Sequence, residues 1–136
     1  MVTYEDWELK IHQRIGNDSV WQFFGYRKAL FLYELAWKDC EKLTQDRRGK
    51  AIVDQIIRSA GSVSANIEEG YGRGHGKSYA YFLRVAVGSA RETKGWYWRS
   101  HQLLSPEVVE HRLALLDEII SLIIVEINRQ KSRNRK

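Results

Sequence analysis

Apolar residues recur every three or four positions along almost the whole chain, and this spacing marks one face of an α-helix. The single proline, Pro106, lies at one of the few interruptions of the pattern. No segment shows the sustained alternation of apolar and polar residues that indicates a strand. The sequence therefore predicts an all-α fold, an up-down-up-down antiparallel four-helix bundle with a short extra N-terminal helix.

Capping residues predict where the helices begin. Thr3 is expected to cap a short helix over residues 4–15, and a capping box of Ser19 and Gln22 starts the first long helix, which ends near 44–45. Asp46 caps the second long helix, which stops among the glycines at 70–76, and the third covers about 77–104. Ser105 precedes Pro106 at the first position of the fourth helix.

Each long helix has an expected core face. On the first, the seam consists of Phe23, Tyr26, Leu30, Tyr33, Trp37 and Cys40, widened by Phe24, Phe31 and Leu35. On the second helix the expected face consists of Ile52, Ile56, Ala60, Val63 and Ile67. On the third it consists of Tyr79, Leu83, Ala86, Val87, Ala90 and Tyr97, and on the fourth of Val109, Leu113, Leu116, Ile120, Ile123 and Ile127.

The chain length and composition limit the class of protein. The 136 residues fit one domain, expected over 1–128, followed by a basic, disordered tail over 129–136. One cysteine excludes an internal disulfide framework, and no apolar run approaches the ~20 residues of a membrane span. The N-terminus carries acids and has no apolar signal segment. We therefore expect a cytoplasmic protein that does not bind a membrane.

The positive charge is concentrated at the C-terminus. Five of the 22 basic residues and none of the 17 acidic ones lie in residues 128–136, so the rest of the chain is formally neutral. Such a run is typical of nucleic-acid binding. It is equally compatible with a solubilising helix end, where the macrodipole favours cations.

The fourth helix has a second apolar stripe of Val108, Leu115, Ile119 and Leu122. Surplus apolar surface on a small domain indicates a partner interface, so we expect a homo-oligomer. The alternative is a thickly packed monomer in which the N-terminal helix covers the stripe.

Polar residues share one face of the second helix at spacings of four, four and three: Arg58, Ser62, Asn66 and Glu69. Ser89 and Glu92 on the third helix are expected to pair with them. Small residues surround this face and allow close helix packing. The chain offers no evident nucleophile and base, so the pattern favours a structural polar network over catalysis.

Two further patterns are compatible with phosphate binding. The glycines at 70–76, with Arg73, His75 and Lys77, are either a phosphate-binding turn or a helix C-cap and connector. On the third helix a face repeats every three or four residues, and it carries Lys77, Tyr81, Arg84, Gly88, Arg91, Gly95 and Trp98. That face suits either phosphate contacts with base stacking or a subunit interface.

Metal and cofactor sites are not expected. The four histidines are scattered, and the Glu107 and His111 pair lacks the other ligands of a di-iron bundle. Cys40 is expected to be a buried apolar residue.

The segment QIIRSAGSVSANIEEGYGRG (55–74), followed by YFLRVAVGSARE (81–92), resembles the bacterial four-helix-bundle family of 23S rRNA intervening-sequence proteins. That family is related to the accessory variability determinant proteins of diversity-generating retroelements. The positions that match its motif are Gln55, Ile56, Arg58, Ser62, Asn66, Ile67, Glu69, Gly70, Phe82, Leu83, Ala86, Gly88, Ser89 and Glu92. Ile57, Ser59 and Glu68 depart from it, and residues before 18 are an addition.

The resemblance implies a four-helix bundle, typically a homopentamer with a basic surface, that has no established reaction. It also implies nucleic acid and a reverse transcriptase as the kinds of partner that the accessory proteins bind. Two functions remain open: a non-enzymatic RNA- or DNA-binding oligomer, or a scaffolding homo-oligomer that binds a protein through apolar helix faces. The candidate nucleic-acid-binding residues are Arg73, Lys77, Arg84, Arg91, Trp98, Arg129, Lys131, Arg133, Arg135 and Lys136.

Overall fold

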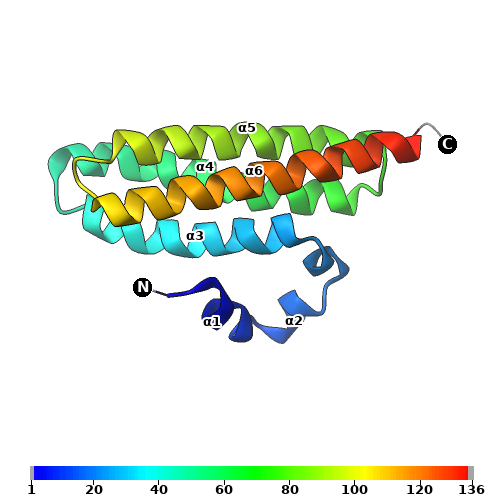
Figure 1. Ribbon diagram of the computed structural model, residues 1–136, viewed down its shortest axis with the longest axis horizontal. Coiled ribbons are helices and arrows are strands. Elements are labelled where there is room, and N and C mark those ends of the chain that lie inside the picture. Colours follow the sequence, from blue (N-terminus) through cyan, green and yellow to red (C-terminus); the bar gives the residue numbers. More distant parts are fainter. Residues whose placement is uncertain (1, 135–136) are drawn as a thin grey trace.

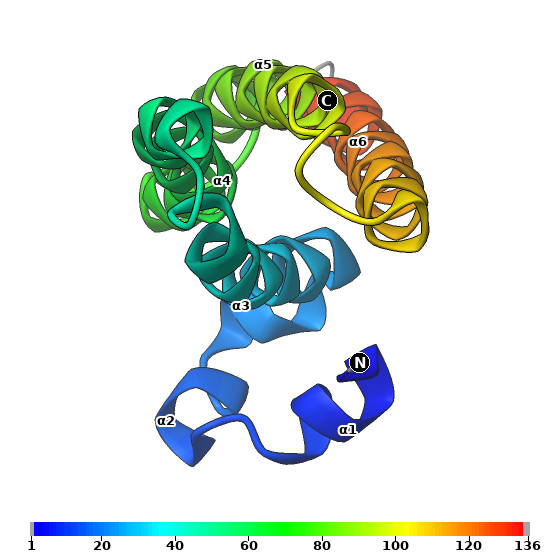
Figure 2. The same ribbon diagram turned by 90° about the vertical axis from the view of Figure 1, so that its left-hand side faces the viewer.

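The computed structural model describes residues 2–134, and these form helices without any strand. In chain order the elements are α1 (Tyr4–Leu9), α2 (Gln13–Gly16), the 3₁₀ helix η1 (Ser19–Gln22), α3 (Phe24–Leu43), α4 (Arg47–Gly72), α5 (Lys77–Arg99) and α6 (Pro106–Asn134). The four long helices pack antiparallel, each beside the next, and α6 closes the bundle against α3 (Figure 1). In the end-on view α1 and α2 lie outside the bundle, beneath α3 (Figure 2). The predicted all-α class is confirmed.

Caps place several helix boundaries where the sequence predicts them. The Asp46 carboxylate accepts a hydrogen bond from the Arg48 backbone N–H at 2.8 Å, and the Ser105 hydroxyl accepts one from Val108 at 3.2 Å. Between α4 and α5, Gly76 adopts a φ of 74°, which favours glycine.

Four boundaries differ from the prediction. The N-terminal helix is broken after Leu9. At the start of the first long helix the chain forms η1 instead, which is capped by Asp18 rather than Ser19: the Asp18 carboxylate accepts a hydrogen bond from the Val20 N–H at 3.1 Å. Helix α5 ends at Arg99, where Ser100 donates its hydroxyl to the Trp96 carbonyl at 2.8 Å.

The fourth difference is at the C-terminus, where α6 continues through residues 129–134 of the expected disordered tail. Gln130 is buried on this last part of the helix, and its amide donates to the Glu126 carboxylate at 2.7 Å. Arg129 also pairs with Glu126 at 2.8 Å, so both side chains support the helix. Arg135 and Lys136 lie outside the described residues.

The core face of α3 also differs from the expected aromatic seam. Trp37 is 58 % exposed and Phe24 is 52 % exposed, whereas Ala29 and Ala36 are fully buried. Small alanines let α3 approach its neighbours closely, so Phe24 and Trp37 lie at the edge of the contact, whereas Tyr26 and Phe31 of the expected face are buried as predicted. On α4 the expected stripe is buried from Ile56 to Ile67.

The N-terminal arm, residues 2–23, covers part of the α3–α6 face. Tyr4 and Trp7 contact the Phe31 ring, with centroid distances of 5.5 and 5.4 Å, and Trp7 also contacts Trp21 at 6.0 Å. Tyr4 and Leu115 line one small cavity at the edge of the arm. Leu115 and Ile119 of the extra α6 stripe are buried within the single chain, as the monomer alternative requires.

None of the helices in residues 2–134 is both long enough and apolar enough to cross a lipid bilayer.

Candidate functional site

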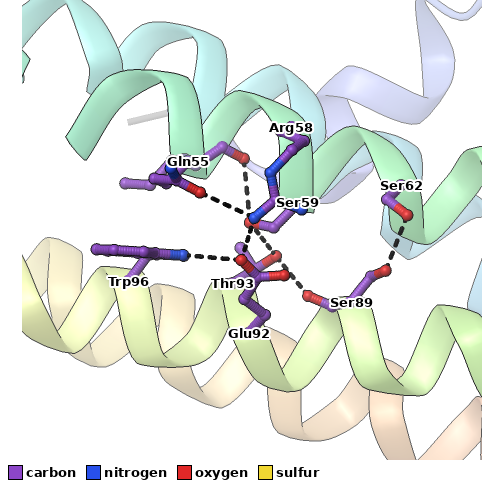
Figure 3. Close-up of polar contacts among 9 residues, drawn as sticks. Gln55, Arg58, Ser59, Ser62, Ser89, Glu92, Thr93 and Trp96 are labelled. Carbon is purple, nitrogen blue, oxygen red and sulfur yellow. Dashed lines mark hydrogen bonds and ion pairs between the residues drawn. The ribbon is translucent and has the colours of Figure 1, made fainter. Parts of the chain in front are cut away.

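A polar network joins α4 to α5 on one side of the bundle (Figure 3). Arg58 forms an ion pair with Glu92, and its guanidinium also donates to the Gln55 side chain at 2.9 Å. Trp96 donates its indole N–H to Glu92 at 3.1 Å. The hydrogen bond from Arg58, and next that from Trp96, lowers the pKa of Glu92, so this carboxylate is ionised at neutral pH.

Hydroxyl groups continue the network along the same helix pair. Ser89 donates to the Ser62 hydroxyl at 2.8 Å, and Thr93 donates to the Ser59 hydroxyl at 2.9 Å (Figure 3). The Asn66 amide donates to the Ser62 carbonyl at 2.8 Å and to its hydroxyl at 2.9 Å. Small hydroxyl residues therefore let α4 and α5 approach closely while their polar groups stay paired.

Five of the six residues expected in a polar network come together: Arg58, Ser62, Asn66, Ser89 and Glu92. Glu69 instead pairs with Arg73, one turn away at 2.7 Å. The prediction missed Gln55, Ser59, Thr93 and Trp96. The sequence does contain a sign of Ser59 and Thr93, because each is a hydroxyl residue at a position where its helix faces the core.

The network carries no group poised for reaction. Its carboxylate is held by a cation, and its hydroxyls bond to one another or to the backbone rather than to a base. Across the described part of the chain, no buried side-chain nitrogen or oxygen lacks a hydrogen-bond partner. A fully paired network of this kind fixes the register of two helices.

A second polar cluster is buried in the core between α3, α5 and α6. The Arg112 guanidinium donates to both Asp39 oxygens, from Nε at 2.8 Å and from Nη2 at 3.0 Å, and the Tyr97 hydroxyl donates to Asp39 at 2.7 Å. Burial, and next the Asp39 charge, raises the pKa of Tyr97 far above its ordinary value. Sequence reasoning missed this cluster, whose only signal is a charged residue at a core position of α3.

The outer face of α5 presents cations and aromatic rings to solvent. Tyr81 and Trp98 are 59 % and 58 % exposed, and Arg84 and Arg91 are exposed between them. Neither arginine forms an ion pair within residues 2–134. We call this the α5 stripe: Lys77, Tyr81, Arg84, Gly88, Arg91, Gly95 and Trp98.

The other candidate cations gather at the end of the bundle where α4 and α6 finish and α5 begins (Figure 1). Arg73 is paired with Glu69, and Arg129 with Glu126. Lys77, Lys131 and Arg133 are exposed.

Backbone N–H groups of the glycine turn at this end have partners within the chain. The Gly76 backbone N–H donates to the buried Gln130 side chain at 2.8 Å, and the Arg73 N–H donates to the Gly70 carbonyl at 3.1 Å. These bonds favour the interpretation of the turn as a helix end and connector.

Potential metal ligands do not gather anywhere in the described residues, where no three His, Cys, Asp or Glu side chains form a suitable group. His111 lies beside Arg112, and burial, with a smaller contribution from that cation, lowers its pKa.

These features define a helical-bundle protein with a paired polar network between α4 and α5 and with exposed cations and aromatic rings on the outer face of α5. The chain belongs to the 23S rRNA-intervening sequence protein family, whose model matches residues 22–125. The function of this family is unknown. The match begins after α1 and α2 and ends at residue 125, so it covers the four long helices except the last turns of α6.

A solved structure supports the same fold. It is the crystal structure of a protein of unknown function from the S23 ribosomal protein family of Bacteroides thetaiotaomicron, 24% identical in sequence with a TM-score of 0.71. The alignment covers 76% of this chain and 97% of that chain. No curated protein matches the sequence.

Proposed function

We propose that the protein is a cytoplasmic, non-enzymatic RNA- or DNA-binding protein that acts as a homo-oligomer, with a pentamer as the favoured assembly. The observation that carries the proposal is the α5 stripe, where two exposed arginines without ion pairs lie between two exposed aromatic rings. Cations that track a phosphate backbone beside rings that stack on bases are the usual means of binding single-stranded nucleic acid.

The geometry of the stripe suits an extended ligand. Lys77 and Trp98 are 21 residues apart on one straight helix, which corresponds to about 32 Å at 1.5 Å per residue. The stripe begins at the basic end of the bundle, so the cations of α6 extend the same positive surface.

The glycines of the stripe are a further indication of a partner. Gly88 lies in the middle of α5, where glycine costs roughly 1 kcal/mol relative to alanine. A Cβ atom at Gly88 would meet nothing within 4 Å, so packing within the chain does not require glycine there. A ligand or a second copy that approaches the helix backbone would require it.

The test is fluorescence anisotropy with a single-stranded RNA and a DNA duplex, at low and at physiological salt. In the Arg84→Gln/Arg91→Gln variant, the loss of two phosphate contacts should weaken binding and reduce the salt slope for single strands by about 1.4. The matched control is Arg47→Gln/Lys50→Gln, which removes two exposed cations from the first turn of α4, outside the α5 stripe. Equal affinity and slope in wild type and the α5 variant would refute the proposal.

The cations of α6 should be tested by substitution. Deletion of residues 128–136 would also remove the buried Gln130 and its bond to Gly76. Lys131→Gln/Arg133→Gln removes charge from exposed positions and leaves that bond in place.

A scaffolding homo-oligomer is the second candidate, and the α3–α4 groove favours it. Trp37 is exposed there beside Val53 and Ile57, in a groove that is mostly apolar. A second copy of the chain, or a protein partner such as a reverse transcriptase, would bury this surface. Light scattering of wild type and Trp37→Glu tests the assembly: a smaller particle for the variant supports an oligomer through this groove, and a monomeric wild type excludes it.

A further inference from the structure

A cleft of about 350 Å³ opens at the basic end of the bundle. It is bounded by four parts of the chain: η1 with the start of α3, the end of α4, the turn before α5, and the last turns of α6. In Figure 1 these segments meet at the end that carries the C-terminus. The volume lies within the range of small-molecule sites, about 300–1,000 Å³.

One wall of the cleft is aromatic. The Tyr71 ring is partly exposed and meets the buried Tyr79 ring edge to face, with centroids 5.9 Å apart. The Tyr71 hydroxyl donates to Ser19 at 2.7 Å, which ties the end of α4 to η1 and fixes the position of the ring. Phe23 extends the same wall. A flat, fixed aromatic surface of this kind suits a nucleobase.

The cationic part of the lining comes from α6. Arg129 and Arg133 are one helical turn apart, and His75, on the turn before α5, also lines the cleft. The one acidic residue in the lining, Glu126, pairs with Arg129 at 2.8 Å and accepts a hydrogen bond from the Gln130 amide at 2.7 Å, so Arg133 is the arginine in excess over the acidic residue. The pairing with Glu126 uses Nε and Nη2 of Arg129. This part of the lining therefore favours an anion, and arginine is well suited to phosphate.

We infer that this cleft binds the phosphorylated terminal nucleotide of a single-stranded nucleic acid, with Arg129 and Arg133 at the phosphate and Tyr71 against the base. The inference rests on the proposed function and adds to it a preference for strand ends. The position supports it, because the α5 stripe begins at Lys77, next to the Gly76 that is bonded to Gln130 of the cleft. A strand that follows the stripe toward this end of the bundle arrives at the cleft.

The experiment compares anisotropy for one internally labelled oligouridylate in four forms: circular, linear with hydroxyl ends, linear with a 5′-phosphate, and linear with a 3′-phosphate. We expect one phosphorylated form to bind about tenfold more tightly than the circle, the effect of one or two charge-assisted hydrogen bonds. Equal binding of all four forms would overturn the inference and leave the proposed function standing. Binding of none would refute the proposed function itself.

Competition with uridine monophosphate shows whether the cleft prefers the end of a strand or a free nucleotide, since both carry a base and a phosphate. A strand end is the ligand if the free nucleotide competes only weakly. If it displaces the phosphorylated strand at equal concentration, the cleft is a nucleotide site and the preference for strand ends is refuted.

Variants then assign the preference to the cleft. Arg133→Gln should remove the difference between phosphorylated and circular RNA, whereas Arg47→Gln, the same change at the far end of the bundle, should preserve it. Tyr71→Phe keeps the ring but loses the bond to Ser19, so it should weaken binding less than Tyr71→Leu, which removes the ring. If the preference survives in Arg133→Gln, or if the two Tyr71 variants behave alike, the assignment is wrong.

Discussion

The buried Asp39–Arg112 pair offers a demanding test of how the bundle is stabilised. The two side chains are only 8% and 4% exposed, and two hydrogen bonds of 2.8 and 3.0 Å join them. Asp39→Asn preserves the size of the side chain but removes its charge. The Arg112 cation then remains in the core without its carboxylate, and the Tyr97 hydroxyl faces a neutral acceptor.

The expected cost follows from this burial. Removal of one partner of a buried ion pair lowers the free energy of unfolding by about 3–5 kcal/mol. Asparagine can still accept one hydrogen bond, so we expect a value near the lower limit, about 3 kcal/mol. With a urea dependence of about 1–3 kcal/mol per molar, the unfolding midpoint should fall by at least about 1 M.

The matched control is Asp117→Asn at the surface. Asp117 pairs with Lys94 at 2.7 Å, a similar distance, but the two side chains are 61% and 39% exposed. The same substitution there should cost no more than about 1 kcal/mol. Urea unfolding followed by circular dichroism, at several protein concentrations to separate folding from assembly, measures both values.

A double substitution tests the cause of the loss. Arg112→Met in the Asp39→Leu background removes both charges and should recover part of the stability, because an apolar pair replaces the buried ion pair at little cost while the buried Tyr97 hydroxyl loses its acceptor. Two results would refute the reasoning: equal losses for Asp39→Asn and Asp117→Asn, or a double variant less stable than Asp39→Asn.

Three further outcomes are expected. Gly88→Ala should raise the free energy of unfolding by about 1 kcal/mol, measured by urea titration, because its Cβ meets open space; a loss would mean that a partner occupies that space. Gly49→Ala should lower it by about 1–3 kcal/mol in the same assay, since its Cβ would overlap the Leu43 carbonyl oxygen. Burial raises the pKa of the Cys40 thiol from 9.0 to about 11, so folding disfavours its ionisation; the unfolding midpoint should fall between these pH values in wild type more than in Cys40→Ala.

Helical periodicity was enough to predict the all-α class and part of the α4–α5 network. Residues spaced by four lie on one side of a helix, so Arg58, Ser62 and Asn66 had to share a face, and Glu92 and Ser89 could meet them from the neighbouring helix. Periodicity alone cannot choose between neighbouring faces of α3, where both are apolar. The choice depends on side-chain size at the closest approach of the helices, and there the alanines, not Trp37, enter the core.

The charge of the tail shows a different limit of sequence reasoning. Composition identifies the cations after residue 128, but the helical state of Arg129, Lys131 and Arg133 rests on contacts that composition does not show, among them the hydrogen bond from the Gly76 backbone to Gln130. That bond anchors the end of α6 to the start of α5, and it holds Arg129 and Arg133 on consecutive turns of a helix. A flexible tail would lose conformational entropy when it binds an anion, whereas cations on an anchored helix have already lost it. The arginines at this end of the bundle are therefore held at a fixed spacing. Recognition of a single phosphate group requires such a spacing, and an unstructured basic segment does not provide it.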